Sequence, residues 1–289
     1  MNTHSMMSPR LVRSVLGMLG SLCAGVVVLS GFSGAASAQG RLDARYEATL
    51  AGIPVGKGTW TIEIADDQFS AAATGGTAGL LKAFAGGSGM GAAQGRVVNG
   101  GLVSSNYQAS TTTSKKSEAI HMVLVNGAIK EYGIEPEPPV DPDRIPVTDA
   151  QRRGVLDPMT GAMLRVPGTG DPLSPEACRT GAAIFDGRMR YDLKLDFKRM
   201  ETVKAEKGYQ GPVVVCAIYF APVAGYIPDR PVIKYLSAAR NMEIAFAPMA
   251  GTRVLVPFRM VIPTPLGTAM LEATQFITTA TPPRVAKTQ

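Results

Sequence analysis

The chain of 289 residues carries 29 basic and 23 acidic residues, a net charge of +6 with both histidines neutral. The charges are interspersed, and no run of lysine and arginine resembles a nucleic-acid-binding surface, so we expect no nucleic-acid partner. A mild attraction to anionic lipid or glycan surfaces is the alternative interpretation, but ordinary soluble proteins carry a similar charge.

The first 38 residues have the composition of a secretory signal. Arg10 and Arg13 precede an apolar run, Leu11–Leu29, and small residues follow as far as Ala36-Ser37-Ala38. A basic start, an apolar core and a small-x-small site are the three parts of a signal peptide. Glycines within the run disfavour a membrane anchor, and a leucine before Cys23 disfavours a lipoprotein. We expect cleavage after the tripeptide, export to a bacterial periplasm, and no transmembrane segment in the mature chain.

Beyond the signal, apolar and polar residues alternate with a period of two. Trp60, Ile62 and Ile64, for example, share one face of a half-buried strand. Asn126-Gly127 is a strong signal for a two-residue hairpin turn, and Asn99-Gly100-Gly101 marks another turn. We expect strands over residues 56–64, 102–113, 118–125, 128–134, 188–198, 213–220, 242–247, 252–262 and 268–278.

The clearest alternation runs from Arg188 to Lys198, with apolar side chains on one face and charged side chains on the other. Val213–Phe220 is apolar on both faces, which suits a strand covered on both sides. Long strands joined by short turns predict an all-β fold, a strongly curved antiparallel sheet forming a β-spiral or open barrel with short helices. We expect a single domain over residues 39–280 and a disordered tail over residues 281–289.

Several stretches interrupt this pattern. Short helices are expected near Thr77–Phe84 and near Asp171–Cys178. The glycine-rich stretches Gly75-Gly76 and Gly86–Gly91 lack the strand-to-helix context of a phosphate-binding loop, and we interpret them as mobile loops. Glu135–Pro146 is rich in proline and unsuited to a central strand. We interpret it as an extended connection between two halves of the sheet, with a recognition segment for a partner as the alternative.

Two cysteines remain after the signal, Cys178 and Cys216. An even count in an oxidising compartment predicts a disulfide between them. Closing a loop of this length is worth roughly 4 kcal/mol in the chain-entropy model. Two free buried thiols are the alternative.

The sequence offers no catalytic or cofactor motif. The mature chain has no Gly-x-Ser-x-Gly elbow, and His121 is its sole histidine that could serve as a base. His121 shares a strand face with Val123 and Val125, which favours a packed strand histidine. Without a Cys-x-x-Cys pair, metal binding is poorly supported. We therefore expect a protein that is not an enzyme and has neither metal nor cofactor.

One segment combines arginine with aspartate at a tight turn. Asp186-Gly187 is a turn pair that leads directly into the strand of residues 188–198. Arg188, Arg190 and Asp192 leave this turn on one face, close enough for an ion-pair network. The four charged residues are either a structural ion-pair turn pinned by the disulfide or a contact for an anionic ligand through the arginines.

The run from Phe185 to Leu193 resembles the hallmark of a bacterial exported family catalogued as domain of unknown function 3108. Further matches are Leu156-Asp157-Pro158, Cys216 with Pro222-x-x-Gly225-Tyr226, Tyr46-Glu47-Ala48 with Gly52-Ile53-Pro54-Val55-Gly56, and Pro263-Thr264-x-Leu266-Gly267. The resemblance implies a layout similar to that of envelope-integrity proteins with a spiral β-sheet and one disulfide. It is more distantly similar to lipoprotein carriers, whose curved sheet wraps an apolar cavity. It implies no catalytic residue.

We therefore expect a non-enzymatic periplasmic protein that supports the integrity of the cell envelope. A curved sheet with one apolar face forms a concave surface, which would bind a lipid chain or an extended segment of an envelope protein. The alternative is a periplasmic hydrolase acting on envelope lipid or glycan, with Asp186, Arg188, Arg190 and Asp192 lining its site. The sequence leaves the oligomeric state open.

Overall fold

The computed structural model describes residues 39–79, 82 and 86–280. The signal peptide expected over residues 1–38 and the tail expected over residues 281–289 lie outside these residues. Half of the helix expected over Thr77–Phe84 lies outside them as well, and Thr77 is the last residue of a strand.

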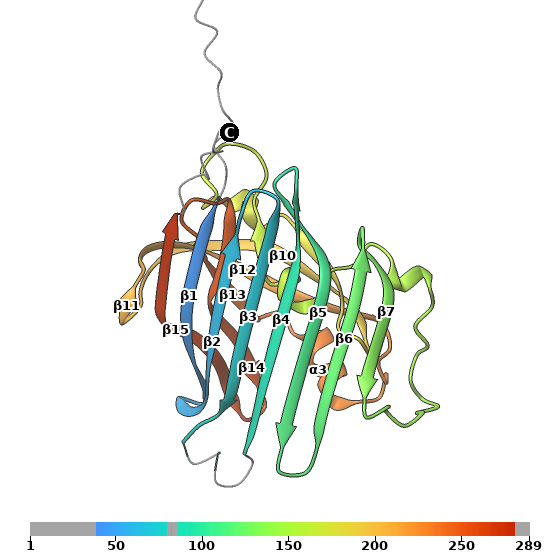
Figure 1. Cartoon of the computed structure of the whole chain (residues 1–289). Coiled ribbons are helices and arrows are strands. Elements are labelled where there is room, and N and C mark those ends of the chain that lie inside the picture. Colours follow the sequence, from blue (N-terminus) through green and yellow to red (C-terminus); the bar gives the residue numbers. More distant parts are fainter. Residues whose placement is uncertain (1–38, 80–81, 83–85, 281–289) are drawn as a thin grey trace, which may run out of the picture. The chain divides into compact units, whose positions relative to one another are not determined.

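The described residues form one sheet of 15 strands in the order β7-β6-β5-β4-β3-β2-β1-β15-β14-β13-β12-β10-β9, with β8 paired to β14 and β11 to β15 (Figure 1). Neighbouring strands are antiparallel except β11 and β15. The strands are β1 (Gly40–Leu50), β2 (Ile53–Ile64), β3 (Gln68–Thr77), β4 (Gly87–Val98), β5 (Gly101–Thr113), β6 (Ser117–Val125), β7 (Ala128–Glu135), β8 (Leu164–Arg165), β9 (Gly181–Phe185), β10 (Arg190–Lys204), β11 (Lys207–Gly208), β12 (Gln210–Ala224), β13 (Glu243–Pro248), β14 (Val254–Thr264) and β15 (Gly267–Ala280).

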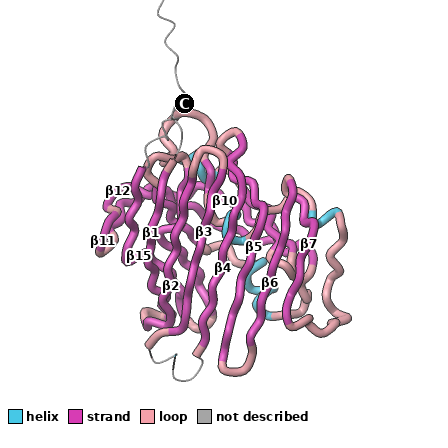
Figure 2. Tube along the Cα trace, viewed as in Figure 1, coloured by secondary structure: helices cyan, strands magenta, loops and turns pink. Residues whose placement is uncertain are grey.

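Helices are short in the described part of the chain, as Figure 2 shows. They are the 3-10 helices η1 (Ala150–Arg152) and η2 (Pro175–Cys178) and the α-helices α2 (Pro158–Gly161) and α3 (Pro231–Ala238). The helix expected near Asp171–Cys178 is present as η2. The sequence analysis missed α3, which is fixed by Leu236 packed on the core and by the Tyr235 hydroxyl donating to the carbonyl of Pro263.

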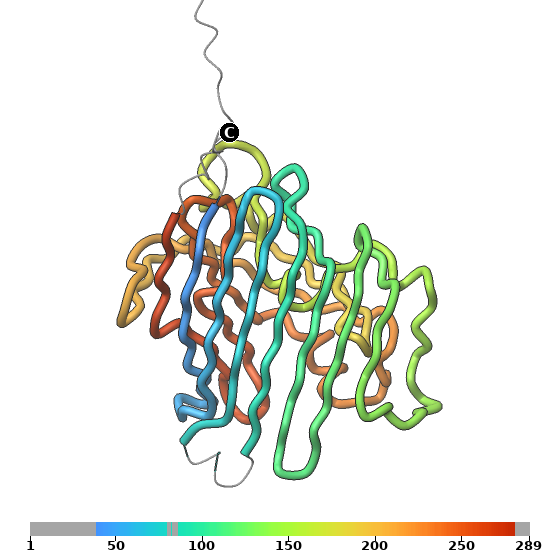
Figure 3. Tube along the Cα trace, viewed as in Figure 1, coloured from blue at the N-terminus to red at the C-terminus, as the bar shows by residue number. Residues whose placement is uncertain are grey.

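The sheet is strongly curved and does not close on itself. In Figure 1, β1–β7 form a front wall and the later strands pass behind it. The first and last strands lie side by side, with Gly40 paired to Ala280 (Figure 3). Strands β7 and β9 are the two edges, and residues 153–156 bridge them, since Arg153 pairs with Ala128 of β7 and Leu156 with Ile184 of β9. The expected fold class, a curved open antiparallel sheet, is confirmed.

The two Asn-Gly turns are also confirmed. Asn99 and Gly100 have φ values of 51° and 72°, and Asn126 and Gly127 have values of 50° and 74°. Positive φ at both central residues is the geometry of a tight two-residue hairpin turn, which asparagine and glycine adopt at low cost. These turns fix the register of β4 with β5 and of β6 with β7.

Strand β12 is covered on both faces, as its apolar sequence predicts. Val213 and Val215 pack in one core cluster with Phe258 and Phe276, while Val214 and Ile218 pack in a second cluster. The second cluster contains the bonded sulfur atoms of Cys178 and Cys216, whose Cα atoms are 5.5 Å apart. The expected disulfide is thus formed and ties η2 to the middle of β12.

The prediction of mobile loops in the glycine-rich stretches was wrong. Gly75 and Gly76 belong to β3, and Gly87 to Gly91 belong to β4, which is paired with a strand on each side. Glycine weakens a strand locally, but the ladders of both neighbours supply the hydrogen bonds that fix the backbone. Because glycine has no side chain, such positions leave space beside the sheet where they face its interior.

The proline-rich stretch follows the end of β7 and connects the front wall to the rest of the chain. Its end is held by two backbone hydrogen bonds, from Ile145 N to Tyr226 O at 2.9 Å and from Gly225 N to Ile145 O at 2.8 Å. The stretch has no regular secondary structure between Glu135 and Pro146, as expected from its lack of amide donors. A role in recognising a partner stays a prediction.

Candidate functional site

The arginine–aspartate motif forms a turn whose side chains each have a partner. The Oδ1 atom of Asp186 accepts hydrogen bonds from the backbone N–H groups of Arg188 at 2.8 Å and Met189 at 2.7 Å. Burial raises the pKa of this carboxyl, against the opposing effect of those two donors. Arg190 pairs with Asp192 at 2.6 Å. The aspartate therefore acts as the acceptor that shapes the turn.

The same turn reaches across to the other edge of the sheet. Arg188 forms an ion pair with Glu118 of β6, and a Cβ atom at Gly187 would lie 2.7 Å from the Ile120 side chain. Tyr132 of β7 packs edge-on against Phe185, with ring centroids 5.5 Å apart. These contacts hold the β9–β10 hairpin against β6 and β7. They favour the structural interpretation of the motif, while an anionic ligand at its arginines stays a prediction.

His121 lies in a strand, as expected, but on the outer face of β6, where it is exposed. Its inward neighbours are Met122 and Leu124, which are buried. The imidazole covers Gly133 of the adjacent strand, where an added Cβ atom would lie 2.2 Å from its ring. The described residues contain no group of three or more histidine, cysteine or carboxylate side chains that could hold a metal ion.

Asp157 is a fully buried carboxylate with four hydrogen-bond donors. It caps α2 by accepting from the backbone N–H groups of Met159 and Thr160, both at 2.9 Å. Its other oxygen accepts from the Thr160 hydroxyl at 2.6 Å and from the Ser104 hydroxyl at 2.5 Å. Asp157 thus anchors α2 to β5, and this places the residues that follow it against the interior of the sheet.

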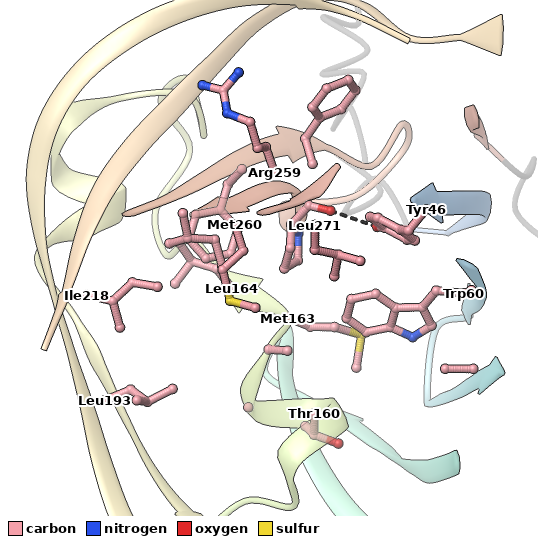
Figure 4. A pocket seen from close by; sticks show the side chains of 18 of the residues that line it. Tyr46, Trp60, Thr160, Met163, Leu164, Leu193, Ile218, Arg259, Met260 and Leu271 are labelled. Atoms are coloured by element: carbon pink, nitrogen blue, oxygen red, sulfur yellow. Dashed lines mark hydrogen bonds between the residues drawn. The ribbon is translucent and has the colours of Figure 1, made fainter. Parts of the chain in front are cut away.

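A cavity of about 690 Å³ lies inside the curve of the sheet, between the two core clusters. Figure 4 shows Tyr46 and Trp60 on one side, Leu193 and Ile218 on the opposite side, and Met163 between them. Most lining side chains are apolar. Further apolar members are Leu102, Leu156, Ala162, Leu164, Leu195, Ile244, Phe246, Pro257, Phe258, Met260 and Leu271.

The cavity exists because small residues occupy the inward positions of β2 and β3. Directly paired residues of neighbouring strands point to the same face, and Tyr46 pairs with Gly58, which pairs with Gly75. Trp60 likewise pairs with Ala73. Beside the two aromatic rings, the wall therefore consists of backbone and the methyl groups of alanines such as Ala73, so no large side chain fills the space there.

Two polar groups on this wall have different environments. The hydroxyl of Tyr46 donates to the carbonyl of Pro257 at 2.7 Å, and burial raises its pKa above the ordinary value. The indole Nε1 of Trp60 is buried and has no hydrogen-bond partner among the described residues. Buried indole N–H groups usually find an acceptor.

Arg259 closes one side of the cavity as part of an ion-pair network. It contacts Glu201 of β10 and lies 3.5 Å from Glu272 of β15, while Arg199 bridges Glu201 and Glu243. Burial opposes ionisation of Glu201, but hydrogen bonds from Arg199 and Arg259 outweigh it and lower the pKa of Glu201. The network joins β10, β13, β14 and β15 at this wall.

Sequence reasoning placed Trp60 on an apolar strand face and expected a concave apolar surface, but it did not identify the other residues that line the cavity. A signal was present, because the inward positions of β2 and β3 change from large apolar residues to glycine and alanine. Asp157 was recognised only as part of the tripeptide Leu156-Asp157-Pro158 that resembles the family, and no role was predicted for it.

Among the described residues, no helix has the length and apolar composition needed to cross a membrane.

This geometry defines a class of protein, an open and strongly curved antiparallel sheet around an apolar cavity. The chain belongs to the family described as Protein of unknown function (DUF3108), whose model matches residues 45–274, and the expected family is confirmed. Among solved structures, the chain is similar to a beta-barrel-like protein of domain of unknown function DUF1849 from Brucella abortus. The identity is 9%, the match covers 83% of this chain and 97% of that chain, and the TM-score is 0.44. No curated protein matches the chain.

Proposed function

We propose that this protein binds a single long apolar chain, such as the acyl chain of an envelope lipid, inside its curved sheet. The observation that carries the proposal is the apolar cavity of about 690 Å³, kept open by glycine and alanine at inward positions. Its volume lies in the range of about 300–1,000 Å³ typical of small-molecule sites. Burying ten methylene groups there contributes roughly 8 kcal/mol before the cost of association.

The cell compartment is part of the same proposal. Residues 1–38 have the composition of an export signal, and the Cys178–Cys216 disulfide suits an oxidising compartment. We therefore propose a non-enzymatic protein of the periplasm that supports the cell envelope through the lipid it holds. Fractionation of the native host should place the processed chain in the periplasm.

The hydrolase alternative receives less support. The carboxylate of Asp186 is occupied by the two amides of its own turn, and Arg188 is occupied by Glu118. None of the four motif residues lines the apolar cavity. An extended segment of a partner protein is the second candidate occupant of the cavity. The binding test below distinguishes it from a lipid chain.

Trp60 is the sole tryptophan of the chain and lines the cavity, so its fluorescence reports on occupancy directly. We expect stearate brominated at mid-chain to quench the emission saturably with one chain per protein. Unbrominated stearate should leave the intensity high and should displace the brominated chain. The absence of saturable quenching up to the solubility limit would contradict the proposal.

Two substitutions in the same strand provide the matched control. A Cβ atom at Gly75 has 3.7 Å to its nearest neighbour, so Gly75→Leu can project into the cavity without a backbone clash. Ala72 is exposed and points to the opposite face. We expect Gly75→Leu to weaken binding at least tenfold and Ala72→Leu to leave it unchanged. Equal effects of the two substitutions on binding would show that the brominated stearate binds outside the cavity.

A further inference from the structure

One cation on the wall of the cavity has no acidic partner. Three cationic residues are among those that line the cavity, namely Lys57, Arg165 and Arg259. Lys57 lies 3.6 Å from Glu47, and Arg259 pairs with Glu201 and Glu272. Arg165 forms no ion pair with any carboxylate in the described residues. Arg165 therefore differs from Lys57 and Arg259, because no acidic group of the described residues offsets its charge.

Arg165 is held in place by backbone oxygens alone. It belongs to β8, where it pairs with Val254 of β14, and its Nε and Nη1 atoms donate to the carbonyls of Gly100 and Val166. The contact with Gly100 connects it to the β4–β5 turn. The Nη2 atom has no acceptor in the described part of the chain. A donor is therefore left over on a residue that lines the cavity.

A second arginine increases the positive charge at this place. Arg253 donates to the carbonyls of Val166 at 3.0 Å, Pro167 at 3.1 Å and Gly170 at 2.6 Å. It shares the Val166 carbonyl with Arg165, and it too has no carboxylate partner among the described residues. Burial, together with the charge of Arg253, lowers the pKa of Arg165. Two neighbouring guanidinium groups thus meet at one carbonyl.

We propose that Arg165 binds the anionic headgroup, a carboxylate or phosphate, of the amphiphile whose tail fills the apolar cavity. The inference rests on the proposed function, because it assigns a headgroup to the chain bound there. Partly buried charges are generally paired, and guanidinium donors match carboxylate and phosphate oxygens. Arg253 adds a second positive charge without entering the cavity.

The test compares probes that share a tail and differ in the headgroup. Hexadecanoate and hexadecyl phosphate carry an anion, and hexadecanol does not. Each is titrated against full-length processed protein by displacement of a brominated neutral chain from Trp60. We expect both anionic probes to bind at least tenfold more tightly than hexadecanol, with the difference shrinking as salt is added.

Arg165→Gln should remove this preference while leaving the affinity for hexadecanol unchanged. Arg165→Lys, which keeps the charge, should restore part of the preference. Lys57→Gln is the matched control, since Lys57 is also among the residues that line the cavity and its ammonium lies 3.6 Å from Glu47, and this variant should keep the full preference. The alcohol affinity shows in each variant that the cavity is still folded.

Other outcomes separate the headgroup inference from the proposed function. Equal affinities of the wild-type protein for the three probes, or an unchanged preference in Arg165→Gln, would overturn the headgroup while the cavity proposal stands. If no probe binds, hexadecanol included, the proposed function itself fails. Inorganic phosphate that competes as strongly as hexadecyl phosphate would show a site for a free anion and would also overturn the inference.

Discussion

The hydroxyl of Ser104 donates a 2.5 Å hydrogen bond to the carboxylate of Asp157, although 53 residues separate them, and both side chains are buried. With the Thr160 hydroxyl and two backbone amides, this bond satisfies both carboxylate oxygens. A helix of a single turn has little stability of its own. The position of α2 at the cavity therefore depends on one aspartate and its contact with β5.

Asp157→Ala should be strongly destabilising because it leaves four donors, three of them buried, without an acceptor. We expect a loss of about 2–4 kcal/mol in the free energy of unfolding. Asp171→Ala is the control, since Asp171 is exposed and accepts one hydrogen bond, from Leu173 N at 2.8 Å. It should cost about 1 kcal/mol or less. Urea unfolding of both variants measures the difference, and equal losses would argue against Asp157 as an anchor.

Alanine at two adjacent cavity glycines should give opposite results. A Cβ atom at Gly58 would lie 2.7 Å from the backbone oxygen of Thr74, whereas at Gly75 the nearest atom is 3.7 Å away. We expect Gly58→Ala to lower the free energy of unfolding by roughly 1–3 kcal/mol. Gly75→Ala should change it by less than about 1 kcal/mol. Thermal unfolding of the pair checks this, and a larger loss for Gly75→Ala would be inconsistent with the register of β2 and β3.

Replacing Cys178 and Cys216 together by alanine should lower the free energy of unfolding by roughly 4 kcal/mol, the chain-entropy value for a loop of this length. The sequence separation is 38 residues. Mass spectrometry after alkylation without reductant should find neither cysteine modified. The reduced wild-type protein is the control and should match the double variant in stability. Alkylated cysteines in protein purified from an oxidising compartment would refute the bridge.

Asp186→Asn should change how stability depends on pH. Burial raises the folded-state pKa of Asp186 above 3.8, so the folded protein binds the proton more tightly than the unfolded chain. The wild-type protein should therefore lose stability as the pH rises from below 3.8 through the raised pKa. The variant keeps the side-chain oxygen that accepts from Arg188 and Met189 but has no charge to bury, so this slope should disappear.

The control for this experiment is Asp186→Ala, which removes the acceptor as well as the charge. It should be less stable than Asp186→Asn at every pH because two backbone amides lose their partner. If the wild-type protein and Asp186→Asn instead show parallel pH profiles, the carboxyl is not desolvated in the folded state.

Local patterns allowed most of the sheet to be predicted. The Asn126-Gly127 turn and the alternation of Trp60, Ile62 and Ile64 need information from only a few neighbouring residues. The strand from Gly87 onward could not be predicted in that way, because its hydrogen bonds come from β3 and β5. Its own residues are poor strand formers. Pairing with distant strands therefore made this segment a strand, although its local propensity predicts a loop.

The candidate site was less predictable for the same reason. The cavity depends on which small residues of different strands share a face, as Gly58 and Gly75 do. That Arg165 lacks an acidic partner can be recognised only when the positions of all the carboxylates near the cavity are known. The pairing of Arg188 with Glu118 likewise joins residues 70 positions apart. These are properties of the packed sheet, and no sequence window contains them.

The bridge formed by residues 153–156 between β7 and β9 makes the sheet resemble a split ring. In a closed barrel, the number of strands and their stagger fix the radius. A split ring has no such constraint, and its bore is set by the side chains packed inside it. Widening this ring would break the hydrogen bonds at the split together with the contacts of Arg188 with Glu118 and of Tyr132 with Phe185, while every ladder from β7 round to β9 stays intact. The width of the interior therefore depends on the contacts across the split and on the packed side chains, and strand number and stagger alone do not determine it.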